Sequence, residues 1–148
     1  MARLDDGYQT LISFAADPTV LFYEKTVTPP GVEGGGAIET TQMDNTAWRT
    51  FSPKSLLTLT NAGITVAYDP ACYDEIIALV NVNTVITITF PDASTLAFNG
   101  YLDKFTPNVC AEGEQPTAEI DVVCTNINAG GTEEGIDNAA IGYTAPPV

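Results

Sequence analysis

The sequence predicts a mainly β domain, a β-sandwich or open barrel with one flanking α-helix at about residues 70–80. Two stretches, 84–107 and 117–125, alternate apolar and polar residues as half-buried strands do. One other stretch has helical spacing, and it lies between groups of strands rather than in βαβ alternation. A chain of 148 residues can bury one real core but is too short for two ordinary domains.

Residues 84–107 are predicted to form a hairpin of two strands around a turn at Pro91–Ser94. Its core face is expected to comprise Ile86, Ile88, Phe90, Leu96, Phe98 and Leu102, and its second face Val85, Thr87, Thr89, Thr95, Ala97, Asn99 and Tyr101. The last strand is expected to point Ala118, Ile120, Val122 and Cys124 inward and Glu119, Asp121 and Val123 outward.

The helix is predicted from its capping pattern. Asp69 can cap it, Pro70 suits its first position, and Asp74 and Glu75 lie in the first turn, where the helix dipole favours acids. Before the helix, residues 8–23 are expected to form one or two strands interrupted at Asp17-Pro18. A strand beginning near Leu56, a turn at Asn61-Ala62-Gly63 and a second strand are expected to lead into the helix.

A long loop is predicted at about residues 24–50. It is rich in Pro, Gly and Thr, with Pro29-Pro30 and Gly34-Gly35-Gly36 at its centre. Loops of this length inside a compact domain are uncommon and tend to be functional. A surface insertion without a function remains the alternative.

Two segments, 55–68 and 76–91, contain no charged residue. Natural edge strands are usually protected by Lys, Pro or bulges, because uncharged open edges invite aggregation. One interpretation is that these strands lie inside the sheet. The other is that their edges pair with neighbouring copies, so that the second face lines a shared lumen.

Composition argues against several functions. With 19 acids and 5 bases, the chain has a net charge of −14, which argues against binding of nucleic acid or anionic lipid. No histidine is present, which excludes Ser-His and Cys-His pairs, and no phosphate-binding glycine motif occurs. The pair Glu119 and Asp121 is a weak glycosidase signal. We therefore expect a non-enzyme with no cofactor and no metal.

The three cysteines are expected to be reduced and buried, because their number is odd and their spacing wide.

Neither a secretory signal nor a membrane span is expected. Residues 1–128 are expected to form the domain, and residues 129–148 an extended acidic C-terminal tail of low hydrophobicity.

The sequence resembles a known family over about residues 1–127. The runs that carry the resemblance are GGGAIETTQMDNTAWRTFSPKSLLTLTNAGITVAYDP, DEIIALVN, ITITFPDASTLAFNGYLDKFTP and EGEQPTAEIDVVCTN. In their order along the chain and in their residue pattern, these runs are similar to the major tail tube protein of long-tailed, non-contractile-tailed bacteriophages. One difference is Ala93, which stands in a turn where that family commonly has glycine. Tubes of contractile tails and of secretion apparatuses share this architecture, and the sequence does not separate them.

The resemblance implies a tail-tube β-sandwich whose hexameric rings stack into the tube that conducts the genome from capsid to host cell. It implies a loop that orders on assembly and contacts the next ring, with candidate stacking residues Thr28, Pro29, Pro30, Gly31, Val32, Glu33, Gly34, Gly35, Gly36, Thr40 and Asp44. The candidates for the lumen are Thr87, Thr89, Asn99, Glu119 and Asp121.

The resemblance also implies the partners and the location. The partners are further copies of the chain, a tape measure protein, and tail terminator and distal tail proteins, while DNA passes without specific binding. The location is the virion tail, assembled in the bacterial host cytoplasm. The alternative function is a monomeric β-sandwich that binds a ligand such as a carbohydrate on aromatic platforms, for which the candidates are Tyr8, Tyr23, Trp48 and Tyr73.

Overall fold

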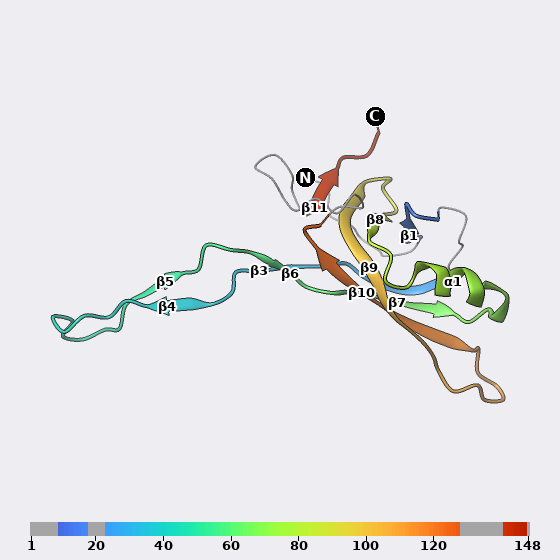
Figure 1. Ribbon diagram of the computed structural model, residues 1–148, viewed down its shortest axis with the longest axis horizontal. Helices are drawn as coiled ribbons and strands as arrows, with labels where there is room; N and C mark the ends of the chain where they lie inside the picture. Colours follow the sequence, from blue (N-terminus) through green and yellow to red (C-terminus); the bar gives the residue numbers. More distant parts are fainter. Residues whose placement is uncertain (1–8, 18–22, 128–140, 148) are drawn as a thin grey trace.

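The computed structural model describes residues 9–17, 23–127 and 141–147, and its main element is one antiparallel sheet of seven strands (Figure 1). The sheet runs in the order β1-β8-β9-β10-β7-β2, and the last strand, β11, pairs with β9. The strands are β1 (Leu11–Phe14), β2 (Glu24–Thr28), β7 (Ala62–Ala67), β8 (Thr84–Thr89), β9 (Thr95–Pro107), β10 (Thr117–Thr125) and β11 (Ile141–Thr144). The predicted mainly β fold with one helix is confirmed.

The sheet curls until its two end strands meet. The backbone N–H of Ile12 on β1 donates a hydrogen bond to Oε1 of Glu24 on β2, at 3.2 Å. Among the described residues these two strands share no backbone ladder. The structure is therefore an open barrel made from a single sheet, which is the second of the two predicted architectures.

The core fills the inside of this curl. Alternate residues of the strands point inward, as the sequence pattern predicts, and the helix adds Ile76 and Leu79. Burial of this much apolar surface is the main favourable term in folding. The buried apolar residues are Ile12, Phe14, Ala62, Ile64, Val66, Ile76, Leu79, Ile86, Ile88, Phe98, Leu102, Ala118, Ile120 and Val122.

The helix begins where the capping pattern predicts. A 3-10 turn, η1 (Pro70–Cys72), leads into α1 (Tyr73–Leu79), and Oδ1 of Asp69 accepts a hydrogen bond from the N–H of Ala71 at 3.0 Å. The Tyr73 ring meets Phe105 of β9 edge to face, with 5.8 Å between ring centroids. This contact helps to fix the helix against the sheet.

Gly100 of β9 pairs with Cys124 of β10 and is buried. A Cβ at this position would stand 2.6 Å from the backbone oxygen of Val123, which cannot move without disturbing the ladder. We expect Gly100→Ala to lower the free energy of unfolding by about 2–3 kcal/mol, because overpacking forces the backbone apart. Chemical denaturation measures this. The control is Gly142→Ala on β11, where nothing lies within 4 Å of the added Cβ; equal losses in both variants would contradict the steric explanation.

Two sequence predictions differ from the structure. The turn expected at Asn61-Ala62-Gly63 is wrong, because Ala62 and Gly63 begin β7 and pair with Val122 and Asp121 of β10. Part of the predicted tail also belongs to the sheet, since β11 pairs with residues 95–98 of β9. The rest of that tail prediction, residues 129–140, lies outside the described residues.

The uncharged strands prove to be interior strands. Strand β8 lies between β1 and β9, and β7 lies between β10 and β2. The interpretation that their edges await a neighbouring copy is therefore wrong for both strands. The thiol prediction is also wrong for Cys110, which is exposed on the β9–β10 turn, whereas Cys124 is half-buried and burial raises its pKa.

Residues 29–60 leave the sheet as a long two-stranded arm between β2 and β7 (Figure 1). It contains two short ladders, of which β3 (Val32–Glu33) with β6 (Thr58–Leu59) is the nearer to the sheet and β4 (Ala37–Glu39) with β5 (Phe51–Pro53) the farther. The segment predicted as a loop over residues 24–50 is thus partly strand. Its first residues, Glu24–Thr28, belong to the main sheet.

Candidate functional site

The root of the arm is held by reciprocal hydrogen bonds between its two strands. The N–H of Gly31 donates to Oγ1 of Thr60 at 2.6 Å, and the N–H of Thr60 donates to the oxygen of Gly31 at 2.9 Å. Pro30 beside them is buried, although residues 31–58 are all exposed. The arm therefore leaves the sheet from a fixed base.

A joint separates the two ladders of the arm. On one strand it consists of Gly34–Gly36, of which Gly35 and Gly36 have φ of 77° and 94°, values that favour glycine. On the other strand residues 54–57 belong to neither ladder, and the N–H of Lys54 reaches the oxygen of Gly36 at 3.3 Å. The glycine run at the centre of the predicted loop thus has a conformational role, because it adopts backbone angles that other residues rarely adopt.

The tip of the arm, residues 40–50, has a defined conformation. The N–H of Thr40 donates to the oxygen of Thr50 at 2.8 Å, and the N–H of Thr50 donates to Oγ1 of Thr41 at 2.9 Å. The side chain of Asn45 accepts from the N–H of Gln42 at 2.8 Å and donates to Oγ1 of Thr50 at 3.2 Å. These local bonds hold the tip in one conformation.

Large apolar side chains project from the arm into solvent. The most exposed are Met43, at 104%, and Trp48, at 84%, both on the tip. Exposed apolar groups that gather on one element mark an interaction site, and aromatic anchors commonly dominate such contacts. The full set is Val32, Ile38, Met43, Trp48, Phe51, Leu56 and Leu57.

The second candidate surface is the outer face of the sheet, meaning the side chains that point away from the core. Thr87, Thr89 and Asn99 lie on it, because they alternate with the buried residues of β8 and β9. Glu119 and Asp121 lie on it in the same way along β10. The structure therefore brings all five lumen candidates to one face of one sheet, which is what the sequence pattern predicts.

The outer face also carries a base that the sequence pattern missed. Lys104 pairs in register with Asp121, so both project from the same face. Simple alternation along β9 would place Lys104 with the core residue Leu102. The register shift between Asp121 and Val122 inserts one extra residue, Asp103, and turns Lys104 outward. The acidity of this face is thus partly offset at one position.

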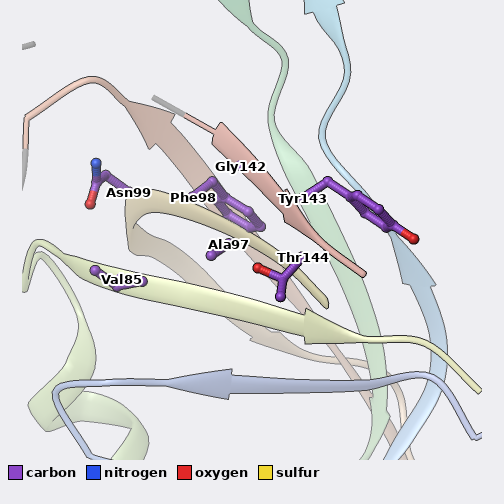
Figure 2. Close-up of a pocket in the computed structure, with 7 residues that line it drawn as sticks. All are labelled: Val85, Ala97, Phe98, Asn99, Gly142, Tyr143 and Thr144. Carbon is purple, nitrogen blue, oxygen red and sulfur yellow. The ribbon is translucent and has the colours of Figure 1, made fainter. Parts of the chain in front are cut away.

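A shallow depression of ≈ 280 Å³ lies on the outer face beside β11. Figure 2 shows Val85, Ala97, Asn99, Gly142 and Thr144 around it, together with Phe98 and Tyr143. None of these side chains is charged, and none is a nucleophile with a neighbouring base. The depression therefore offers no catalytic chemistry.

Elsewhere in the described residues, no three His, Cys, Asp or Glu side chains gather as metal ligands, and no helix is long and apolar enough to cross a membrane. The carboxyl group of Asp92 accepts hydrogen bonds from the Oγ and N–H of Ser94, at 2.5 and 2.9 Å, which lower its pKa. These bonds close the β8–β9 turn, where Ala93 has φ of 69°. The role of Asp92 is therefore to stabilise this turn.

The described aromatic residues among those considered for sugar binding do not form a platform. Trp48 lies on the tip of the arm and Tyr73 begins α1, and these elements lie at opposite ends of the molecule (Figure 1). Tyr23 precedes β2 and is exposed, while Tyr8 lies outside the described residues. Nothing in the described part favours the carbohydrate-binding alternative.

The fold is similar to subunits of solved tail assemblies. A chain in the virion of a native gene transfer agent (GTA) particle matches with a TM-score of 0.62 and 11% identity, over 96% of this chain and 100% of that one. A chain in the tail of an empty GTA particle with C6 symmetry matches with a TM-score of 0.61 and 10% identity, over the same shares. A chain in the six-fold symmetrised baseplate of the anti-feeding prophage matches with a TM-score of 0.52 and 9% identity, over 82% of this chain and 92% of that one.

No protein-family model and no curated protein matches the sequence. At these low identities the structural likeness establishes the fold alone. The chain therefore shares its fold with chains found in a gene transfer agent virion, a gene transfer agent tail and a prophage baseplate.

Proposed function

We propose that this protein is a non-enzymatic structural subunit of a phage-type tail tube. Its copies form hexameric rings, the rings stack, and the resulting tube conducts the genome from capsid to host cell. The observation that carries the proposal is the arm: an ordered projection with seven large exposed apolar side chains, attached to a compact barrel. Exposed apolar side chains of this number are typical of a surface that another molecule covers.

The length of the arm supports stacking rather than a local contact. Residues 29–43 can span at most about 50 Å when extended. Figure 1 shows the arm directed away from the sheet, so the tip cannot reach its own core in this conformation. We assign the stacking contacts to the arm, including the candidates from Thr28 to Gly36 with Thr40 and Asp44. The arm is already hydrogen-bonded within itself, and burial in a neighbour would offset the entropy cost of fixing its position relative to the barrel.

The outer face supports a role as the inner wall of the tube. It carries threonines, Asn99 and the exposed carboxylates of Glu119 and Asp121, and its bases among the described strands are Lys104 and the exposed bulge residue Lys25 of β2. A wall with few bases repels phosphate, so DNA can slide along it. By the same proposal the protein belongs to the virion tail, is assembled in the host cytoplasm, and meets tape measure, terminator and distal tail proteins at the ends of the tube.

Electron microscopy of the purified protein tests the proposal. We expect six-fold rings and stacked tubes at high protein concentration, and a 15.6 kDa monomer at low concentration. The measurement is negative-stain imaging combined with analytical ultracentrifugation. A protein that stays monomeric at every concentration and salt condition, including after addition of preformed tail ends, would contradict a self-assembling tube.

A further inference from the structure

The arm and the helix lie at opposite ends of the long axis of the molecule (Figure 1). Two different surfaces at opposite ends can join copies head to tail, and such a contact either closes into a ring or propagates along a stack. The helix end is therefore a natural place to look for the surface that receives the arm. Its charge and its exposed residues can be compared directly with those of the arm.

The joint of the arm combines apolar bulk with positive charge. Leu56 is 83% exposed and Leu57 is 72% exposed, and both follow Lys54 within the stretch that belongs to neither ladder. Lys54 has no carboxylate within ion-pair distance among the described residues, whereas Arg49 is paired with Glu39 at 3.2 Å. Residues 46–60 contain these two bases and no acid, in a chain whose net charge is −14.

The exposed side of α1 has the complementary features. Ile77 is 53% exposed and Tyr73, four residues earlier, is also exposed, so both lie on the same side of the helix. Asp74 lies three residues before Ile77, so its exposed carboxylate borders the same side, whereas Glu75 is two residues from both Tyr73 and Ile77 and projects elsewhere. Residues 69–81 contain no base. This side of the helix therefore offers an apolar strip bordered by negative charge.

The spacing of the two surfaces allows both contacts at once. Lys54 and Leu56 are two residues apart, with a bend at Ser55 between them. Asp74 and Ile77 are about 4.5 Å apart along the helix axis. The flexible lysine stem can therefore reach the Asp74 carboxylate while a leucine packs on Ile77.

We propose that residues 54–57 of the arm dock on the exposed side of α1 in a second copy of this chain. Leu56 and Leu57 pack on Ile77 and Tyr73, and Lys54 pairs with Asp74. The occupant is a second copy because the surplus of negative charge lies on the body of this chain and the unpaired arm base lies at the joint. The proposal rests on the proposed tube: it names the surface that receives the arm when one ring stacks on the next.

Charge reversal tests the polar part of the contact. Lys54→Glu and Asp74→Lys are each expected to raise the protein concentration needed for tube growth about tenfold, because like charges then face one another. Combining the two substitutions should restore growth. The matched control for the acceptor is Glu112→Lys, an exposed residue on the β9–β10 turn, which lies at the same end of the molecule (Figure 1). Rescue of Lys54→Glu by that control, or no rescue by the α1 variant, would overturn the assignment.

A mixing experiment tests the direction of the contact. A variant with Leu56→Asp/Leu57→Asp has no functional joint, and Ile77→Asp has no functional acceptor, while both retain the core because these side chains are exposed. Each variant alone is expected to form single rings that do not stack. A mixture of the two variants is expected to form stacks of two rings, which negative-stain imaging can detect. Circular dichroism is the control that tests whether both variants are folded.

The two proposals fail in different ways. Wild-type protein that forms no rings or tubes contradicts the proposed function. Wild-type tubes together with variants that elongate normally, or a mixture that yields no two-ring stacks, leave the tube intact and refute docking on α1.

Discussion

Removal of the arm is expected to abolish tube growth while leaving the barrel folded. Strands β2 and β7 are antiparallel neighbours, with Thr28 opposite Gly63. Replacing residues 30–61 with Asn-Gly keeps this register and closes a tight hairpin. Most of the arm is exposed, and of its residues Pro30 is the one that is buried, so thermal stability should change little. Sedimentation velocity and negative stain measure the loss of tubes.

A milder variant separates the tip from the rest of the arm. Met43→Ser/Trp48→Ser is expected to raise the concentration needed for assembly about thirtyfold or more, because truncation of an interface anchor costs about 2 kcal/mol or more. Val109→Ser on the β9–β10 turn removes a similarly exposed apolar group away from the arm and is the control. Tubes of normal length from the arm-deleted protein would show that stacking depends on another surface.

Reversal of the charges on β10 is expected to make the tube retain DNA. In the Glu119→Lys/Asp121→Lys variant, rings of added cations would join Lys104, which already lies opposite position 121. Assembly should continue, because both side chains are exposed and outside the core. DNA retention should fall steeply as salt rises, since lysine–phosphate binding releases counterions. Filter binding of short duplex DNA to purified tubes at low and high salt measures this effect.

The control for this experiment reverses the same number of charges elsewhere. Glu112→Lys/Glu114→Lys changes the β9–β10 turn, which is exposed and lies off the outer face. It should bind DNA on the exterior without slowing genome ejection from assembled particles. If both variants behave alike in ejection, Glu119 and Asp121 do not line the channel, and the acidity of the outer face is explained by solubility.

The alternation of apolar and polar residues was the sequence signal that predicted strands most reliably. Alternation located β10 at residues 117–125 with the correct inward face, and the Asp69 cap with Pro70 located the helix. These signals are local, since they depend on side-chain period and on hydrogen bonds between residues close in sequence. The five outer-face candidates followed from the same period.

The features that were missed depend on pairing between distant segments. The bulge that turns Lys104 outward is a shift in the register between β9 and β10. The periodicity of residues along β9 alone does not reveal such a shift. The arm looked like a loop because its ladders are only two and three residues long and glycines separate them. Asn61-Ala62-Gly63 has the composition of a turn, yet Gly63 lies between Asp121 and Thr28 inside the sheet.

The pairing of β1 with β8 has a consequence for how the chain folds. Leu11 pairs with Thr89, so the first strand must wait until most of the domain has been synthesised. The β8–β9 and β9–β10 hairpins join neighbours in sequence and close early, whereas the long loop between β1 and β8 makes this pairing slow. Until β1 arrives, the uncharged edge of β8 is open to pairing with a wrong chain. The subunit is therefore most prone to misassembly late in folding, before the N-terminal strand has docked.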